Sequence, residues 1–480
     1  MTTTTTARAG SGAAETTPRN TRMILVVILL SYFMILLDNS IIFTGLPQIR
    51  ASFGFSASGL AWVSDAYTLV FGGLLLLGAR AGDLLGRRRV FIVGLAIFSL
   101  ASLLVGVAPT GWFAVAARAI QGIGAAIVAP SSLSLLTASF PAGRERVKAI
   151  GLYGATAGIG ASLGLVIGGA LAAEISWRVG FFINVPIGVA MMVLAPRFLP
   201  ETPRQPGRFD VTGALTATLG VGALVFGIIH AAGSGWGAPT TVGSVVIGAV
   251  LMAALVAGER RAQQPIMPLR LFASHERVVG YLTRMLYMAA MMGFFFFTSQ
   301  YMQGVLGFTA LAAGFGFLPM TVVNFVVAMA VPRVTQRLGQ NVPLAAGVGL
   351  AAVGMLWLAQ VGTGSSYWTA VAAPMLLIGI GQGLVFAPVT SLGLAGVQSS
   401  DAGAASGLIN SFHQVGSAVG LGVLVTVSAH AGAGRDTASA VLTAQVHVAL
   451  EVAAAILALA LLVVLTLFIT KLIRLRRTNH

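Results

Sequence analysis

Charge is scarce in this sequence. Only 9% of its 480 residues are charged, whereas hydrophobic residues make up 57%. A soluble domain carries roughly 25% charged residues, so a soluble protein of this length could not cover its surface with polar groups. A lipid solvent removes the difficulty, because the outside of the protein can then be apolar. The composition therefore excludes an ordinary soluble protein and predicts a protein embedded in a membrane.

Cysteine is absent, which excludes disulfides, cysteine metal sites and cysteine nucleophiles. No glycine-rich phosphate loop ending in Lys-Ser or Lys-Thr occurs, so the chain is not itself an ATP-driven pump. Metal-ligand spacings and a Ser/His/Asp constellation are also missing. The sequence thus predicts no enzyme, no metal and no cofactor.

Acidic residues are few, 13 against 28 Lys and Arg, which gives a net charge of +15. The basic residues lie in short loops between apolar runs and not on one face, so they indicate membrane topology and not a nucleic-acid partner. With the N-terminus in the cytoplasm, 23 of the 28 fall on the cytoplasmic side and three on the other, while Arg118 and Arg284 lie inside spans. This bias predicts a multi-pass protein of the bacterial cytoplasmic membrane with both termini in the cytoplasm.

Fourteen apolar runs are long enough for the hydrocarbon core, which needs about 20 residues of helix. They are 23–46, 59–79, 89–108, 112–137, 149–172, 178–197, 212–231, 241–258, 279–303, 309–332, 343–361, 366–394, 402–429 and 446–470. The polar ends, 1–21 and 472–480, are predicted to be cytoplasmic tails, the first of them disordered. The expected fold class is an all-α membrane protein.

Glycine spacing reveals an internal repeat. Gly160 and Gly164 in the fifth run recur as Gly416 and Gly420 in the thirteenth, at an offset of 256. Runs 1–6 therefore match runs 9–14, and runs 7 and 8 are an insertion. The expected domains are six-helix bundles at 22–198 and 276–471, joined by a linker at 199–275 that contains the two inserted helices. Two similar halves are typical of a transporter whose central site opens alternately to each side.

Three ionisable residues fall inside spans at a similar depth. Asp38, Asp65 and Arg118 each lie roughly 8–10 Å below the external face at 1.5 Å per residue. An ionisable group in hydrocarbon is costly and is a functional candidate. A nearby Arg favours the ionised carboxylate, so a change in the Arg–Asp distance would couple protonation to conformation. We predict proton coupling by these residues; the alternatives are a fixed ion pair between two helices and, for Asp65, simple exposure to water.

Other polar residues inside the spans carry weaker signals. A substrate cavity is predicted to involve Gln121, Asn410, His413 and Gln414, with hydrogen bonding between helices as the alternative. Arg284 lies near a span end, and we interpret it as reaching toward the lipid headgroups. The Phe294–Phe297 run and the neighbouring methionines are interpreted as packing or lipid-facing residues, although they would also suit an adaptable apolar pocket.

Five segments together resemble the major facilitator superfamily, and within it the fourteen-helix drug:proton antiporters. They are LDNSIIFTGLPQI at 37–49, WVSDAYTL at 62–69, GARAGDLLGRRRV at 78–90, RAIQGIGAA at 118–126 and WRVGFFINVPIG at 177–188. The resemblance covers nearly the whole chain after about residue 22. It implies the major facilitator fold and a monomer that exports drugs, antibiotics or other amphiphilic small molecules, with the proton gradient as the energy source.

The resemblance also implies two structural motifs. A cytoplasmic gate is expected at Arg80, Gly82, Asp83, Gly86, Arg87 and Arg88. An acid among these bases could pair with a loop Arg or a helix terminus and hold one side shut; the alternative is that the bases only orient the chain, but orientation needs no acid. A helix-packing motif is expected at Gly160, Gly164, Gly168 and Gly169.

One position departs from the antiporter pattern. Leu165 stands where these antiporters often have Pro, which removes the expected kink and leaves open an importer or symporter of the same fold. A membrane receptor or enzyme is a further alternative, which the two-half repeat and the lack of a catalytic constellation disfavour.

Overall fold

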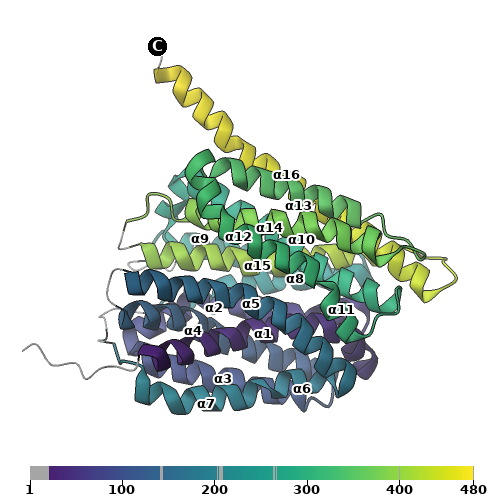
Figure 1. The fold of residues 1–480 in the computed structure, drawn as a ribbon, viewed down its shortest axis with the longest axis horizontal. Helices are drawn as coiled ribbons and strands as arrows, with labels where there is room; N and C mark the ends of the chain where they lie inside the picture. Colours follow the sequence, from purple (N-terminus) through teal and green to yellow (C-terminus); the bar gives the residue numbers. More distant parts are fainter. Residues whose placement is uncertain are drawn as a thin grey trace, which may run out of the picture.

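The computed structural model describes residues 21–140, 144–202, 204, 209–262, 265, 267–398 and 401–478, and from residue 470 on it describes the backbone alone. This part of the chain folds into helices and contains no strand. The tail prediction for 1–21 falls outside the described residues except for Thr21, which is helical. In Figure 1 the helices run side by side, and the start of the first and the end of the last lie at one end of the bundle, here called the terminal end. The opposite end is called the far end.

The N-terminal half contains six spans. Its helices are α1 (Thr21–Phe53), α2 (Ala57–Leu85), α3 (Arg87–Gly106), α4 (Gly111–Ser139), α5 (Arg144–Glu174), α6 (Trp177–Phe182) and α7 (Asn184–Phe198). The short α6 continues directly into α7, so the two together form the sixth span, Trp177–Phe198.

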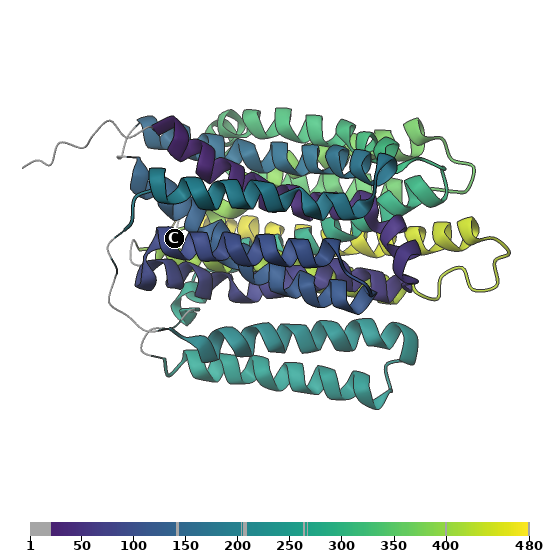
Figure 2. The same ribbon diagram turned by 90° about the horizontal axis from the view of Figure 1, so that it is seen from below.

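Two inserted helices follow, α8 (Val211–Ser234) and α9 (Pro239–Glu259). They form a hairpin on the outside of the bundle (Figure 2), in which α8 lies against α2 and α15 (Ala402–Ser428) and α9 packs on α8. A short 3-10 helix, η1 (Leu269–Ala273), leads into the C-terminal half.

The C-terminal half repeats the plan. It contains α10 (His275–Gly304), α11 (Ala310–Gly316), α12 (Leu318–Leu338), α13 (Asn341–Leu358), the π-helical η2 (Trp368–Ala372), α14 (Ala373–Gly393), α15 and α16 (Ala438–Thr478). The last helix is longer than the predicted span 446–470, because the segment from 438 to 478 contains neither Gly nor Pro to end it. Residues 472–478, predicted as part of a tail, therefore continue α16.

Thirteen stretches of the described chain are long and apolar enough to cross a membrane, and α5, with 31 residues, is the fourteenth helix of sufficient length. Burial follows the same logic, since many large apolar side chains on the outer helix faces stay exposed, as they would toward lipid. The prediction of a multi-pass, all-helical membrane protein is confirmed, and thirteen of the fourteen predicted spans meet the length and apolarity that a membrane crossing needs.

The repeat predicted from glycine spacing reappears as equivalent packing. A Cβ atom at Gly160 or Gly164 would press on α1, and one at Gly416 or Gly420 would press on α10 in the same way. The glycines let each helix pair approach closely, as small residues do in membranes. The central helix contact of each half, α1 with α5 and α10 with α15, thus depends on a pair of glycines at equivalent positions.

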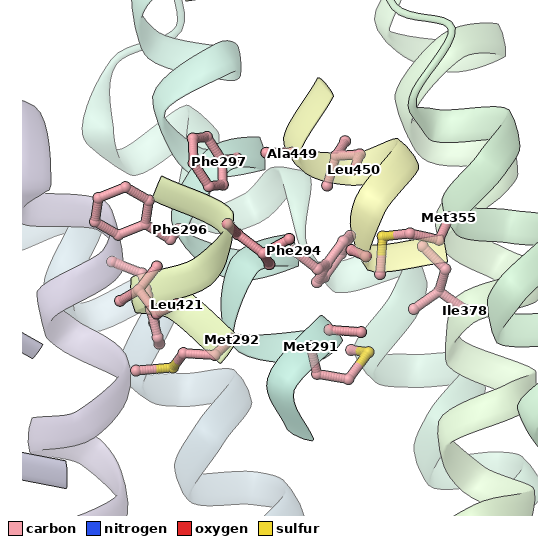
Figure 3. Close-up of a cluster of buried hydrophobic side chains, with 14 of the residues drawn as sticks. Met291, Met292, Phe294, Phe296, Phe297, Met355, Ile378, Leu421, Ala449 and Leu450 are labelled. Atoms are coloured by element: carbon pink, nitrogen blue, oxygen red, sulfur yellow. The ribbon is translucent and has the colours of Figure 1, made fainter. Parts of the chain in front are cut away.

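Buried apolar residues fill the interior of the C-terminal half. Figure 3 shows Met291, Met292, Phe294, Phe296 and Phe297 packed among side chains of α13 to α16. Each of these five side chains is buried. They are therefore packing residues, and the alternative that they face lipid is wrong for these five.

The two halves meet at the far end. At the crossing of α5 and α11, a Cβ atom at Gly169 would strike the backbone of Ala310, and one at Gly314 would strike that of Leu165. Gly168, one position before, faces α1 instead, where a Cβ atom would lie 2.6 Å from the Cα of Ile41. The predicted packing motif thus serves two contacts, one inside its own half and one across the halves.

Hydrogen bonds between α1 and α10 join the halves beside this crossing. Ser299 Oγ donates to the carbonyl of Phe43 at 2.7 Å, and Gln303 Nε2 donates to that of Thr44 at 3.1 Å. Together with the α5–α11 crossing, they close the far end of the interface.

A second contact between the halves is the α2–α15 seam, where Ser411 Oγ donates to the carbonyl of Gly72 at 3.0 Å. At the terminal end, by contrast, a Cβ atom at Gly151 or Gly154 of α5 would meet no neighbouring atom within 4 Å among the described residues. The halves are therefore joined at the far end and along the seam, while the face of α5 that carries Gly151 and Gly154 makes no such contact.

Candidate functional site

Asp38 is fully buried in α1, and α4 supplies two of its partners. Arg118 Nη1 lies 2.6 Å from Asp38 Oδ2, and Gln121 Nε2 donates to Oδ1 at 2.8 Å. The two α4 residues are three apart, which puts them on one face of the helix. Arg118 Nη1 also donates to Gln121 Oε1 at 2.8 Å, so the three side chains form one network.

Asn184 completes this network and was not identified from the sequence. Its Nδ2 donates to Asp38 Oδ1 at 2.8 Å and to Ser102 Oγ at 3.0 Å. It is fully buried at the start of α7. The signal was present, because Asn184 is the one amide side chain in the span Trp177–Phe198. Side-chain donors thus lie on both carboxylate oxygens of Asp38.

Arg118 connects this network to α2. Its Nε donates to the carbonyl of Val63 at 3.0 Å, and its guanidinium carbon lies 4.2 Å from the centroid of the Tyr67 ring. Its Nη2 is buried and has no hydrogen-bond partner among the described residues. One buried guanidinium therefore interacts with α1, α2 and the Phe181 ring of α6 as well as with its own helix.

Asp65 does not join the other two predicted proton-coupling residues. It is fully buried, and both of its carboxyl oxygens lack a hydrogen-bond partner in the part of the chain that the structure describes. The reason is angular: Tyr67, two residues on, faces Arg118, and side chains two apart on a helix point about 200° apart. Asp65 instead shares a face with Leu69, which packs on α8 and α15. The alternative that Asp65 faces water is wrong.

The predicted cavity residues separate into three places. Gln121 is fully buried in the Asp38 network, which corrects the expectation that it lines a cavity. Gln414 lies on the α2–α15 seam, where its Cβ would meet a side chain at Gly72. Asn410 is exposed and donates to the carbonyl of Ser406 at 3.0 Å. His413 is partly exposed and is described below with Arg284.

Arg284 is buried, with 8% of its surface exposed, and its guanidinium carbon lies 4.1 Å from the centroid of the Phe386 ring. The interpretation that it reaches the lipid headgroups is therefore wrong. Helix α10 is a central helix, enclosed by α1, α14, α15 and α16, so a side chain on this turn has no direct route to lipid. The ring of His413 lies 6.3 Å from that of Phe386, on the side of α15.

The residues of the predicted gate cluster at the terminal end of α2 and α3. Arg87 Nη2 pairs with Asp83 Oδ1 at 3.0 Å and its Nη1 donates to the carbonyl of Ser134 at 3.3 Å. Between the helices, Gly86 adopts φ +100°, a conformation that side chains disfavour. Its N–H donates to the carbonyl of Gly82 at 3.2 Å and closes the turn.

Arg88 binds a second acid that follows α7. Its Nε lies 3.7 Å from Glu201 Oε2, and its Nη1 donates to the carbonyl of Leu199 at 3.2 Å. Arg80 lies one turn before Asp83 on α2. The side chains of Arg87 and Arg88 bond to α2, to α4 and to the end of α7 with the residues that follow it, so in this conformation they brace the α2–α3 turn against the N-terminal half and the start of the linker. Their part in a gate remains a prediction.

Residues 28–421 match the sequence profile of the Major Facilitator Superfamily. The chain belongs to this superfamily. It is 39% identical to the cephamycin export protein CmcT of Amycolatopsis lactamdurans over 83% of each chain. It is 37% identical to the puromycin resistance protein pur8 of Streptomyces alboniger, covering 83% of this chain and 80% of that one. It is 30% identical to the methylenomycin A resistance protein of Streptomyces coelicolor, over 82% and 83%.

Solved structures show the same fold at low identity. The nucleoside transporter NupG matches with a TM-score of 0.66 and 11% identity, over 93% of this chain and all of that one. A bacterial homologue of the human lysosomal transporter Spinster matches with a TM-score of 0.66 and 15% identity, over 94% and 97%. The resemblance to the major facilitator superfamily is confirmed, and the relatives of this chain in that superfamily are transporters.

An ion pair outside the membrane fastens the terminal end of this superfamily member. Arg270 in η1 binds Asp401, just before α15, through two hydrogen bonds of 2.8 and 2.7 Å. These bonds hold the pKa of the Asp401 carboxyl below its ordinary value of 3.8. The pair links the connection after the inserted helices to the start of the helix that forms the seam.

We predict that Asp401→Asn lowers the melting temperature of the purified protein by an amount that depends on pH. A carboxyl group whose pKa is lower when folded contributes stability above its unfolded pKa and loses it as the pH falls through the folded value. The difference between wild type and variant should therefore be constant from about pH 7 to pH 5 and shrink below about pH 4. A difference that stayed unchanged down to pH 3 would show that the carboxylate charge is not responsible.

Proposed function

We propose that this transporter exports small amphiphilic compounds, among them drugs or antibiotics, in exchange for protons. The observation that carries the proposal is the set of relatives that match over four-fifths of this chain. Their names state cephamycin export, puromycin resistance and methylenomycin resistance. Three differently named antibiotics favour a common export role over the import of one metabolite.

The Asp38 network supplies a means of coupling export to protons. Protonation of Asp38 would remove the counter-charge of Arg118 and weaken the 2.6 Å contact that joins α1 to α4. Two of the helices that contact Arg118, α1 and α2, also contact the C-terminal half, α1 through α10 and α2 through α15. A proton taken up at Asp38 would thus change the contacts of helices that form the interface between the two halves, and alternating access requires those halves to move relative to each other.

The orientation, oligomeric state and energy source that we propose are inferred from the sequence. We place both termini in the cytoplasm and the protein as a monomer in the bacterial cytoplasmic membrane, with the proton gradient as its energy source and no cofactor. In this orientation the terminal end is cytoplasmic and the far end is external. A structure joined at the far end is then closed toward the outside of the cell.

Transport into inverted membrane vesicles tests the proposal. Vesicles from cells that express the protein are energised to an acidic interior and offered a panel of neutral, anionic and cationic dyes, with puromycin and a cephamycin. An exporter coupled to proton exchange accumulates at least one of them, and an uncoupler abolishes the accumulation. A symporter importing its substrate would not accumulate it in this direction. If no compound of the panel accumulated above vesicles without the protein, drug export would be refuted.

A further inference from the structure

A group of polar atoms without partners surrounds Phe386 of α14 in the interior of the protein. The guanidinium of Arg284 stacks on this ring at 4.1 Å, yet its Nε and Nη1 are buried and have no hydrogen-bond partner among the described residues. A buried cation without a partner is costly, and buried polar groups are nearly always satisfied. Arg284 therefore requires an explanation that packing does not give.

Three more atoms of the same kind lie around the ring. Tyr287 Oη and His413 Nδ1 are buried without a described partner, and both rings lie 6.3 Å from Phe386 in edge-on geometry. Gln382 Oε1 is a further unpartnered atom, and Gln382 precedes Phe386 by one helical turn on the same face of α14. Helices α10, α14 and α15 thus each contribute unpartnered polar atoms to the surroundings of the Phe386 ring.

The charge of this place is positive. The buried Asp38 is bonded to Arg118, and the ionisable side chains close enough to interact electrostatically with Arg284 include Tyr32, Tyr287 and His413. Tyr32 belongs to α1 and stacks on Tyr153 of α5 with ring centroids 4.0 Å apart. The site therefore has one lone cation, carries aromatic rings from both halves, and has no carboxylate of its own among its described neighbours.

We propose that Arg284, with Tyr287, Gln382 and His413, forms a subsite for the anionic group of an amphiphilic substrate, such as a carboxylate. The guanidinium fork and the hydroxyl and imidazole groups donate to the anion, while Phe386, Tyr32 and Tyr153 contact the apolar body. The inference rests on the proposed export function and adds a substrate class to it. Because the rings come from both halves, rocking of the halves would take the site apart and release the anion.

Three probes with one aromatic body test the charge preference. Pyrenebutyrate is anionic, pyrenebutanol is neutral and pyrenebutyl-trimethylammonium is cationic. Their binding to the purified full-length protein in a non-ionic detergent is followed by pyrene fluorescence. Wild type should bind the anion most tightly. Arg284→Gln should weaken binding of the anionic probe by about tenfold or more, the range of a hydrogen bond to a charged group. The same change should strengthen binding of the cationic probe and leave binding of the neutral probe nearly unchanged. Arg284→Lys should keep part of the preference.

Arg178→Gln is the matched control. Arg178 also stacks on an aromatic ring, 4.6 Å from that of Trp177, but its Nη1 already donates to the carbonyls of Gly106 and Ala108 at 3.1 Å each. Removing this satisfied Arg should leave the order of the three probes unchanged. Opposite shifts for anion and cation on Arg284→Gln alone cannot arise from a loss of folding, which would weaken all three.

Each contrary result has a definite meaning. Equal binding of the three probes to wild type, or parallel losses in Arg284→Gln, would overturn the anion subsite and leave export of neutral compounds intact. Failure of wild type to bind any probe, together with no accumulation in vesicles, would overturn the export function itself. Displacement of pyrenebutyrate by phosphatidylglycerol but not by phosphatidylcholine would assign the site to a lipid headgroup and overturn its assignment to a free substrate.

Discussion

Replacing Asp38 with Asn is expected to abolish proton-driven accumulation of substrate in vesicles. The carboxyl group is the one titratable acid in the buried network of Arg118, Gln121 and Asn184. An amide of the same shape cannot take up or release a proton, so uphill transport should fall by roughly tenfold or more, while exchange of substrate without a gradient continues. Accumulation with and without an imposed pH gradient separates the two activities.

Stability requires its own control, because Asp38→Asn also leaves the buried Arg118 without a counter-charge. Breaking one partner of a buried pair costs about 3–5 kcal/mol, whereas removing both charges costs much less. The double variant Asp38→Asn with Arg118→Gln should therefore recover most of the melting temperature and still fail to accumulate substrate. If the double variant were to accumulate substrate against a gradient, Asp38 would not be the proton carrier.

Most of the fold could be predicted from the sequence because the bilayer imposes it. An apolar run of about 20 residues in a chain with little charge has to be a spanning helix, and the glycine offset of 256 between Gly160 and Gly416 already identified equivalent helix contacts in the two halves. Breaks within a span were not predicted. Neither the change from α6 to α7 near Ile183 nor the π-helical start of the span that contains α14 interrupts the apolar pattern.

For the site, the sequence could predict only how deep in the membrane each side chain lies. Counting residues gave Asp38, Asp65 and Arg118 one depth, but depth does not fix the direction in which a side chain points. Direction is set by packing: α2 turns Tyr67 toward Arg118, while Leu69, on the same helix face as Asp65, packs on α8 and α15. The same limit applies to Arg284, whose place near a span end suggested the headgroups, although its helix is enclosed by others.

Gly169→Leu is the second substitution with a large expected effect, because it should prevent closure of the far end. A Cβ atom at Gly169 would overlap the carbonyl oxygen of Ala310, and the nearest other atoms belong to the same backbone, 2.9 and 3.0 Å away. Backbone cannot turn aside as a side chain can, so the α5–α11 crossing has to open. Transport, which needs both states, should fall by roughly tenfold or more, and the far side of the interface should become accessible.

Accessibility can be measured cleanly because the chain contains no cysteine. Thr44→Cys places a single thiol on the residue whose carbonyl accepts from Gln303 of the other half, at a side chain that is fully buried and lies against Gly168 of α5 in this structure. A membrane-impermeant maleimide added on the external side should label it faster in the Gly169→Leu background than in its absence. Gly151→Leu is the matched control on the same helix, since a Cβ atom there meets nothing within 4 Å. Equal labelling rates in the two leucine variants would show that the α5–α11 crossing does not hold the far end closed.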